Sequence, residues 1–566
     1  MRYLILSCLV ICLASCKPSE EKPTEEKPTE EKTSKDNTTN ENAFGEIETS
    51  DDLSAISTKD FREFKVLDSK YIDSSKIWSV FNDDLKDFSE ATYNELKPLV
   101  LDQDIPTIQK HINARQLSYE LLTKFYLYRI RQFDRENELS LNSVIALNPN
   151  VITEAKQKDR ELLNRMMKPS VFGMPILLKD NINASGMPTT AGAVALKDNN
   201  AEDAFIVKRL KDSGALILGK ANLSEWAYFF CGDCPSGYSA IGGQTLNPYG
   251  RKIMDTGGSS SGSGVAVAAN FCAAAIGSET SGSILSPASQ NSTVGFKPTI
   301  GLASRSGIVP ISSTLDTAGP ITKNVMDNAI VLDALFGEDA SDSKSISSIW
   351  ESPFYQKDLK NASLEGKRFG AFKSLMDDQL YANAITVLKS QGAEIIEIEA
   401  IETPLPGFLR LLNLDMKKDL VTYLNAYGNE NLDYASIEDI MAFNRKDSLN
   451  VMPYGQALFQ GIADDTATEE EFADIKFILK TNGLRFFDEP MKAHNLDGIL
   501  SINNYHAGHA AVAEYPAITV PMGYTEDGVP KGLTFISSRL REKQILEWAY
   551  VYEQGSKMRK APVNYN

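Results

Sequence analysis

The sequence predicts an α/β fold with a mostly buried β-sheet. Short apolar segments of four to six residues, each bounded by Gly, Pro or a charged residue, alternate with helical patterns over roughly 400 residues. Such alternation is typical of strands covered by helices. The expected strands span residues 175–178, 215–219, 368–372, 394–398 and 517–520. We find no internal repeat and no linker after residue 60, so one large domain is the simplest interpretation.

Helical periodicity precedes the first of these strands. Apolar side chains recur every three or four residues between residues 107 and 134, and again between residues 150 and 167. This spacing places them on one face of a helix. We therefore expect one or two amphipathic helices in the first segment and one in the second.

Composition and charge restrict the function. The chain has 566 residues, of which 42% are hydrophobic, so it can bury a large core. Its formal net charge is −18, and we find no cluster of Lys and Arg of the kind that phosphate binding requires. The sequence therefore argues against a nucleic-acid partner.

The N-terminus is interpreted as an export signal. Residues 1–16 combine one positive charge with an apolar run that is too short to span a bilayer. The run ends in Leu-Ala-Ser-Cys, which resembles a bacterial lipobox. Cleavage there would leave Cys16 as a lipid-modified first residue, anchored in the cell envelope on its periplasmic or outer face. The alternative is a plain secretory signal in which Cys16 is incidental.

The next segments differ in composition. Residues 17–59 are expected to be a disordered tether, because Glu-Lys-Pro-Thr occurs twice and apolar residues are lacking up to about residue 42. Residues 60–104 are expected to form an N-terminal helical extension, and residues 105–562 the main domain.

Two Gly/Ser-rich turns stand out, at residues 257–263 and 277–284. A helix of small residues is expected between them, which would place the hydroxyl groups at the two ends of one compact unit. A phosphate-binding loop is excluded, because the first turn lacks both the Lys-Ser/Thr pair and the G-x-G-x-x-G spacing.

A serine nucleophile needs a base. His506 and His509 have no acid partner at a fixed spacing, so a polar structural role is expected for them rather than a metal or triad role. Lys179 ends an apolar segment, where desolvation would lower its pKa toward neutrality, as a general base requires. Taken alone, Lys179 has the alternative interpretation of a solvated surface charge.

Together these motifs resemble the amidase signature family in order and spacing. The similarity rests on Gly-Met-Pro-Ile-Leu-Leu-Lys-Asp-Asn around Lys179, on the two Gly/Ser turns and on residues 294–312. Further matching segments are residues 189–192, 219–226, 242–248, 315–320 and 515–521. The similarity covers residues 105–562 and is greatest to the peptide-amidase-like branch. It implies one catalytic domain with a mixed, twisted β-sheet covered by helices on both faces.

The resemblance also implies a Ser–cis-Ser–Lys triad. Ser283 would be the acylated nucleophile, Ser259 the bridging serine on a cis peptide, and Lys179 the base. The backbone N–H groups that would form the oxyanion hole are those of Thr280, Ser281, Gly282 and Ser283. The implied reaction is hydrolysis of a linear carboxamide through an acyl-enzyme, with no metal or other cofactor.

Two departures from the family pattern bear on the substrate. Ser281 stands where the related branch usually carries Asp, and Leu285 stands where many members carry an Arg that binds carboxylates. The change at Ser281, a side chain expected at the mouth of the pocket, means that the specificity of relatives does not transfer directly. Leu285 favours a neutral or blocked amide, such as a peptide amide, over a substrate with a free carboxylate.

Other interpretations remain open. One alternative is a catalytically silent, surface-binding lipoprotein. Another is the glutaminase subunit of a tRNA-dependent amidotransferase; Leu285 and the export signal argue against this second alternative. Cys231, Cys234 and Cys272 are possible free thiols, and no disulfide framework is expected. For the C-x-x-C pair Cys231 and Cys234, a structural or pocket-wall role is expected rather than a redox motif or half a metal site. The sequence does not indicate the oligomeric state.

Overall fold

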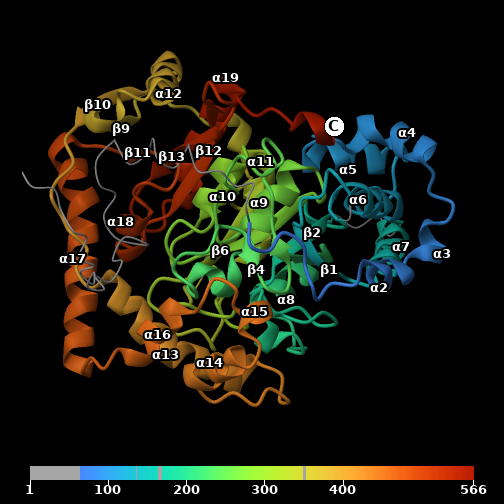
Figure 1. Ribbon diagram of the computed structural model, residues 1–566. Coiled ribbons are helices and arrows are strands. Elements are labelled where there is room, and N and C mark those ends of the chain that lie inside the picture. Colours follow the sequence, from blue (N-terminus) through green and yellow to red (C-terminus); the bar gives the residue numbers. More distant parts are fainter. Residues whose placement is uncertain (1–63, 136, 164–167, 348–351) are drawn as a thin grey trace, which may run out of the picture. The chain divides into compact units, whose positions relative to one another are not determined.

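A mixed β-sheet forms the centre of the molecule (Figure 1). The computed structural model describes residues 64–135, 137–163, 168–347 and 352–566, which lie in one compact unit, Glu41–Asn566. Within these residues the sheet has eleven strands in the order β1-β3-β2-β6-β8-β7-β12-β13-β11-β9-β10. The predicted signal, Cys16 and the tether lie outside the described residues and stay predictions.

The strands are short and mostly buried. They are β1 (Val144–Leu147), β2 (Pro175–Lys179), β3 (Leu216–Ala221), β6 (Ala274–Glu279), β7 (Val294–Lys297), β8 (Thr317–Thr322), β9 (Arg368–Phe372), β10 (Glu394–Ile398), β11 (Gly498–Ile502), β12 (Ala517–Tyr524) and β13 (Pro530–Ile536). All five predicted strands are confirmed, as β2, β3, β9, β10 and β12. A separate hairpin pairs β4 (Tyr238–Ser239) with β5 (Gly243–Gln244).

The sheet contains two groups of parallel strands, which are separated by a block of antiparallel strands. β2 is parallel to both β3 and β6, and β9 is parallel to β10 and β11. The strands between them, from β6 through β8, β7, β12 and β13 to β11, are antiparallel. The C-terminal ends of β2 and β6 therefore lie at the same edge of the sheet. Lys179 lies at the end of β2, and the second Gly/Ser turn lies at the end of β6.

Helices cover both faces of the sheet, as predicted. α8 (Phe205–Asp212), α11 (Val325–Leu335), α19 (Glu542–Ser556) and α12 (Gln379–Ser390) contact one another in that order. α9 (Ser261–Ala268) and α10 (Leu285–Gln290) contact each other. α9 and α11 pack on the same two strands, β6 and β8, but not closely on each other. The two groups of helices therefore lie on opposite faces of the sheet.

The N-terminal helices pack on the same core. α2 (Ser74–Ser79), α3 (Asn82–Leu85) and α4 (Glu90–Val100) precede α5 (Ile105–Asn113), α6 (Tyr119–Phe133) and α7 (Val151–Leu162). The predicted helix over 107–134 is thus two helices, because the Ser118 side chain caps a new helix by accepting from Leu121 N. The boundary predicted at residue 104 stays a prediction.

A group of five helices follows β10 in the chain. It consists of α13 (Phe408–Tyr427), α14 (Ile437–Arg445), α15 (Ser448–Val451), α16 (Ala457–Asp464) and α17 (Glu469–His494), and we call it the helical cover. Its apolar side chains form a second core with Trp226 and Phe230. In Figure 1, α13 to α16 lie together and the long α17 stands beside them.

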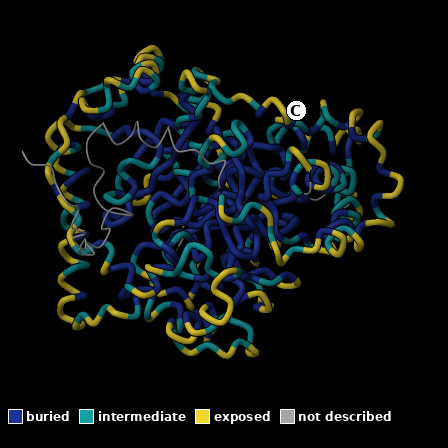
Figure 2. The backbone as a smooth tube through the Cα atoms, in the orientation of Figure 1, coloured by how far each residue is buried: buried dark blue, intermediate teal, exposed yellow. Residues whose placement is uncertain are grey.

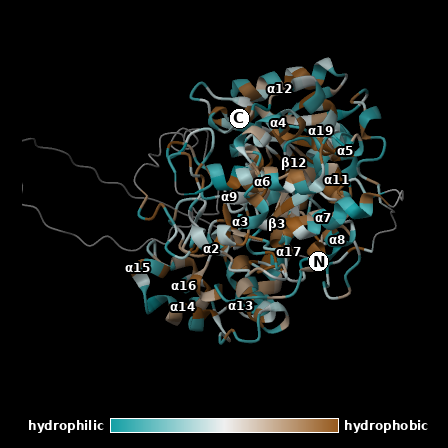
Figure 3. Cartoon of the chain, turned by 90° about the vertical axis from the view of Figure 1, so that its right-hand side faces the viewer, coloured by the Kyte–Doolittle hydropathy of each residue, from teal (hydrophilic) through white to brown (hydrophobic). Residues whose placement is uncertain are grey.

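Burial follows this architecture. The strands and the helices nearest to them are buried, while the outer helices alternate between buried and exposed positions (Figure 2). Figure 3 shows hydrophobic stretches along β3 and hydrophilic stretches on helices such as α7 and α8. None of the described helices is both long enough and apolar enough to cross a membrane.

Candidate active site

Lys179 is the last residue of β2, between β3 and β6, and is fully buried. Its Nζ contacts Ser259 Oγ at 2.8 Å, Ser278 O at 3.0 Å and Ser278 Oγ at 2.9 Å. Burial lowers the pKa of Lys179 to about 7, although the carboxylates of Asp316 and Glu279 act in the opposite direction. The amine is therefore close to the protonation balance that a base at neutral pH needs.

The two Gly/Ser turns lie side by side rather than at the two ends of a unit, so that expectation is wrong. The chain leaves the first turn through α9 and returns along β6, a strand that the Ala- and Gly-rich sequence did not reveal. Ser260 N donates to Ser283 O at 3.1 Å, and Ser260 Oγ donates to Ser278 O at 3.1 Å. Ser259 and Ser283 are therefore brought to the same edge of the sheet as Lys179.

The backbone at Ser259 has the conformation that the resemblance implies. The peptide bond between Gly258 and Ser259 is cis. Ser259 O accepts from Ser224 N at 3.0 Å, and its Oγ faces Lys179 Nζ. The bridging position is thus held by Lys179 at the end of β2 and by Ser224 in the segment after β3.

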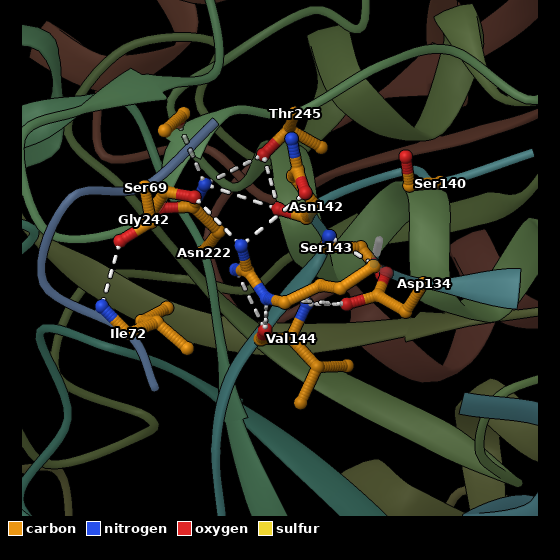
Figure 4. A network of polar contacts seen from close by, with 12 residues as sticks. Ser69, Ile72, Asp134, Ser140, Asn142, Ser143, Val144, Asn222, Gly242 and Thr245 are labelled. Carbon is orange, nitrogen blue, oxygen red and sulfur yellow. Dashed lines mark hydrogen bonds and ion pairs between the residues drawn. The ribbon is translucent and has the colours of Figure 1, made fainter. Parts of the chain in front are cut away.

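Asn222 belongs to a network of polar contacts that also includes Asn142 and Thr245 (Figure 4). Asn222, which directly follows β3, donates from Nδ2 to Asn142 O at 3.1 Å, to Gly243 O at 3.1 Å and to Thr245 Oγ1 at 2.9 Å. Asn222 O in turn accepts from Gly262 N, in the first turn of α9, at 3.0 Å. A Cβ at Gly262 would lie 2.5 Å from Asn222 N and O, so only glycine allows α9 to approach β3 this closely.

The second turn presents free backbone N–H groups. Glu279 Oε2 accepts from Ile284 N at 2.7 Å and from Leu285 N at 3.0 Å. The N–H groups of Thr280, Ser281, Gly282 and Ser283, which lie between Glu279 and Ile284 in the chain, donate to no acceptor among the described residues. Gly282 has a φ of +83°, which favours glycine. This arrangement can receive a developing oxyanion.

Ser283 offers a hydroxyl at the same place. The residue is 9% exposed, and its Oγ has no hydrogen-bond partner among the described residues. An unpaired, accessible hydroxyl beside free N–H groups and a buried amine is suited to attack a carbonyl carbon.

Asp316 anchors the second turn, and the sequence reasoning missed it. Thr280 Oγ1 donates to Asp316 Oδ1 at 2.5 Å, while Asp316 Oδ2 accepts from Ile311 N at 2.8 Å and from Ser312 N at 2.9 Å. Burial raises the pKa of Asp316, and these hydrogen bonds oppose the rise. Its signal was the Leu-Asp-Thr-Ala-Gly-Pro segment at residues 315–320, which was used only as a family match.

Ser278 is the second residue that was missed. Its Oγ accepts from Lys179 Nζ and, at 2.9 Å, from Asn181 Nδ2. Ser278 stands inside the motif Gly-Ser-Glu-Thr, but its position on β6 beside Lys179 is a consequence of parallel pairing with β2. Nothing in the local sequence shows that pairing.

The two histidines pack among aromatic rings. His506 Nδ1 contacts Ser501 Oγ at 2.7 Å, and His509 Nε2 contacts Thr403 O at 2.9 Å. His509 stacks on Phe486 with centroids 4.1 Å apart, and burial lowers the pKa of His506 to about 3. These contacts agree with a structural role. Among the described residues, no group of three or more His, Cys, Asp or Glu side chains is placed to hold a metal ion.

Cys231 and Cys234 form a disulfide, so the expectation of free thiols is wrong for this pair. The short Cys-Gly-Asp-Cys loop is held next to α16, where Leu458 N donates to Phe230 O at 3.0 Å. A C-x-x-C spacing allows either state, and the sequence offers no further signal. Cys272 is a free, buried thiol, and burial raises its pKa to about 12.

One cavity in the described part of the chain lies away from these groups. A space of about 790 Å³ is lined by residues of α5 and of the segment 356–361, and includes neither Lys179 nor the two serines. The candidate site is identified instead by the convergence of its polar groups.

The chain is similar to known amidases. Residues 122–452 match the family model described as Amidase. A probable amidase of Arabidopsis thaliana is 37% identical over 474 residues, which cover 81% of this chain and 91% of the relative. A solved amidase family protein from Bacillus anthracis str. Ames is 37% identical with a TM-score of 0.82, covering 88% of this chain and 99% of its own. A peptide amidase from Stenotrophomonas maltophilia is 38% identical with a TM-score of 0.77, covering 82% and 98%.

Proposed function

This chain belongs to the amidase family of hydrolases acting on carbon–nitrogen bonds, and we propose that it cleaves linear carboxamides with Ser283 as nucleophile, Ser259 as proton relay and Lys179 as general base. The observation that carries this assignment is the contact between the buried Lys179 amine and Ser259 Oγ at 2.8 Å. A lysine whose pKa is about 7 is partly neutral at neutral pH and can accept a proton, whereas a solvated lysine is almost fully protonated.

The arrangement allows a balanced proton route. Ser283 Oγ attacks the carbonyl carbon while its proton passes to Ser259 Oγ, whose own proton passes to neutral Lys179. The carbonyl oxygen becomes an anion that the N–H groups of Ser281, Gly282 and Ser283 would stabilise. Collapse breaks the C–N bond, and the proton returns through Ser259 to the leaving nitrogen. Water then repeats the route in place of the amine and releases the acid from Ser283.

We propose a neutral or blocked acyl group, such as that of a peptide amide, as the substrate. Leu285 lies in an apolar cluster with Phe372 and Phe486, so the position after Ser283-Ile284 offers no cation to a carboxylate. The similarity to a peptide amidase supports the same class. Free glutamine, whose carboxylate would stay unpaired there, is expected to be a poor substrate.

The test is ammonia release from a panel of blocked peptide amides and simple acyl amides. Wild type should release ammonia from at least one neutral amide, and Ser283→Ala should release none above background. Wild type that is folded but silent on every amide would favour the surface-binding alternative. Preference for free glutamine would favour the glutaminase alternative.

We further propose that Cys16 carries the lipid anchor and places the enzyme in the cell envelope. The support is the Leu-Ala-Ser-Cys sequence that ends the apolar N-terminal run. Labelling of growing cells with a radioactive fatty acid should mark the wild type and leave Cys16→Ser unmarked. Equal labelling of both, or of neither, would contradict the proposal.

A further inference from the structure

The side chain of Asn504 lies against the second turn. A Cβ at Gly282 would come within 2.9 Å of Asn504 Nδ2, 3.2 Å of its Cβ and 3.4 Å of its Cγ. The carboxamide of Asn504 therefore covers Gly282, the residue directly before Ser283. No other feature of the proposed reaction uses Asn504.

The turn that carries Asn504 is firmly held. Asn503, with a φ of +47°, donates from N to Gly532 O and accepts from Gly532 N through Oδ1, both at 2.8 Å. Asn503 O also accepts from Thr534 Oγ1. Because both edges of Asn503 are bonded to β13, the direction in which Asn504 leaves the backbone is fixed.

The side chain of Asn504 is half-buried, and its polar atoms have no partner within the described residues. The hydroxyl of Ser281 is also without a partner there, and a Cβ at Gly508 would lie 3.8 Å from it. Both side chains are partly exposed, so a bound molecule with matching polar groups can replace their water with direct hydrogen bonds.

The sheet order separates Asn504 from the proton route. Lys179 ends β2, on one side of β6, whereas Asn504 follows β11, on the other side. Ser283, in the turn after β6, lies between them. If the leaving nitrogen faces Ser259 and Lys179, which must return its proton, the acyl part of the substrate extends toward Asn504.

We propose that Asn504 determines specificity by binding the peptide group that precedes the scissile amide. A carboxamide has both a donor and an acceptor, and so matches the C=O and N–H of a peptide group. It carries no charge, so it cannot neutralise a free carboxylate or ammonium group at that place. This inference rests on the proposed function and narrows its substrate to amides of N-acylated amino acids and peptides.

The experiment compares two amides of the same shape. One is N-acetyl-alaninamide, and the other is its saturated isostere, in which methylene groups replace the peptide group. Ammonia release is measured for wild type, Asn504→Ala and Asn504→Leu. Asn361→Ala is the control, because Asn361 is exposed and makes no side-chain hydrogen bond within the described residues.

We expect Asn504→Ala to raise KM for N-acetyl-alaninamide about tenfold, with kcat changed by less than about twofold, since a lost hydrogen bond to a neutral group has this size. KM for the isostere should not change. Asn504→Leu should have a lower KM for the isostere than for N-acetyl-alaninamide. This result would show that the polarity of the side chain, rather than its size, determines the preference.

Two results would overturn the inference alone. These are an equal rise of KM for both amides, which indicates a structural effect on the turn, and no change for either. Failure of folded wild type to hydrolyse both amides would instead reject the proposed function, and this inference with it.

Discussion

The two Gly/Ser turns and the helical cover are built in opposite ways. The turns and the segment between them come from one continuous stretch, in which every residue of α9 and β6 is buried and the side chains are small. The helical cover is held by large apolar side chains from distant segments, such as Trp226 against Phe459. The comparison shows that the two serine turns are encoded in one local stretch, while the helical cover is assembled from residues far apart in the chain.

The largest effect should follow from removing the amine of Lys179. Lys179→Met should lower kcat by about 10⁴-fold, as loss of one member of a catalytic unit does elsewhere. The melting temperature should not fall, because an apolar side chain of similar length replaces a fully buried amine. A variant that retains a tenth of wild-type kcat would show that Lys179 is not the base.

Phe459 tests the other side of the comparison. It is fully buried, with ring centroids 5.2 Å from Trp226 and 5.0 Å from Phe230. Phe459→Ala should lower the free energy of unfolding by about 3–5 kcal/mol through the cavity it leaves. Denaturant unfolding measures this change, and kcat on a small acyl amide should stay within about twofold of wild type, since Phe459 touches none of the proposed catalytic groups.

The matched control is Phe477→Ala. Phe477 is 72% exposed on α17, so its loss should change the free energy of unfolding by less than about 0.5 kcal/mol. A large loss of kcat in Phe459→Ala, with the fold retained, would mean that the helical cover also takes part in the chemistry.

These two regions also mark what the sequence predicted and what it did not. The order of Lys179, Ser259 and Ser283 was readable because turns that need glycine and hydroxyl groups leave a dense local signature. The strand β6 was missed, since Ala, Gly and Ser show no alternation of apolar and polar residues. No local pattern in the sequence singled out Asn504.

Long-range pairing explains the remaining misses. Asp316 contacts Thr280 across 36 positions of the chain, and Lys179 contacts Ser278 across 99. Local periodicity carries no information on such contacts. The disulfide between Cys231 and Cys234 was missed for a different reason, because the spacing of the two cysteines is equally compatible with free thiols.

Thr280 should have an intermediate effect. Thr280→Val keeps the shape but removes the hydroxyl that donates to Asp316, so the second turn should lose its anchor. We expect kcat to fall by about 10- to 100-fold, less than the loss of a direct oxyanion donor. Thr280→Ser retains the hydroxyl and should keep most of the activity. Equal losses in both variants would point to packing of the methyl group instead.

The smallest effect concerns the pH profile. Lys179 must be neutral to accept a proton, so kcat/KM of wild type should fall as the pH drops below about 7. The charge of Asp316 raises the pKa of Lys179, so Asp316→Asn should move this acidic limb to lower pH. The profile of Thr280→Val, in which that carboxylate is retained, should keep its limb near that of wild type. A limb that moves to higher pH in Asp316→Asn would contradict the electrostatic argument.

The central claim, that Ser283 is the nucleophile, is tested most directly by trapping the acyl-enzyme. Wild type is mixed with an activated ester of an N-acylated amino acid, and the reaction is quenched in acid. The protein is then digested, and the masses of the peptides are measured by mass spectrometry. The account predicts one added acyl group on the peptide that contains Ser283, and none on Ser283→Ala. An acyl group on Ser259, or one that persists in Ser283→Ala, would contradict it.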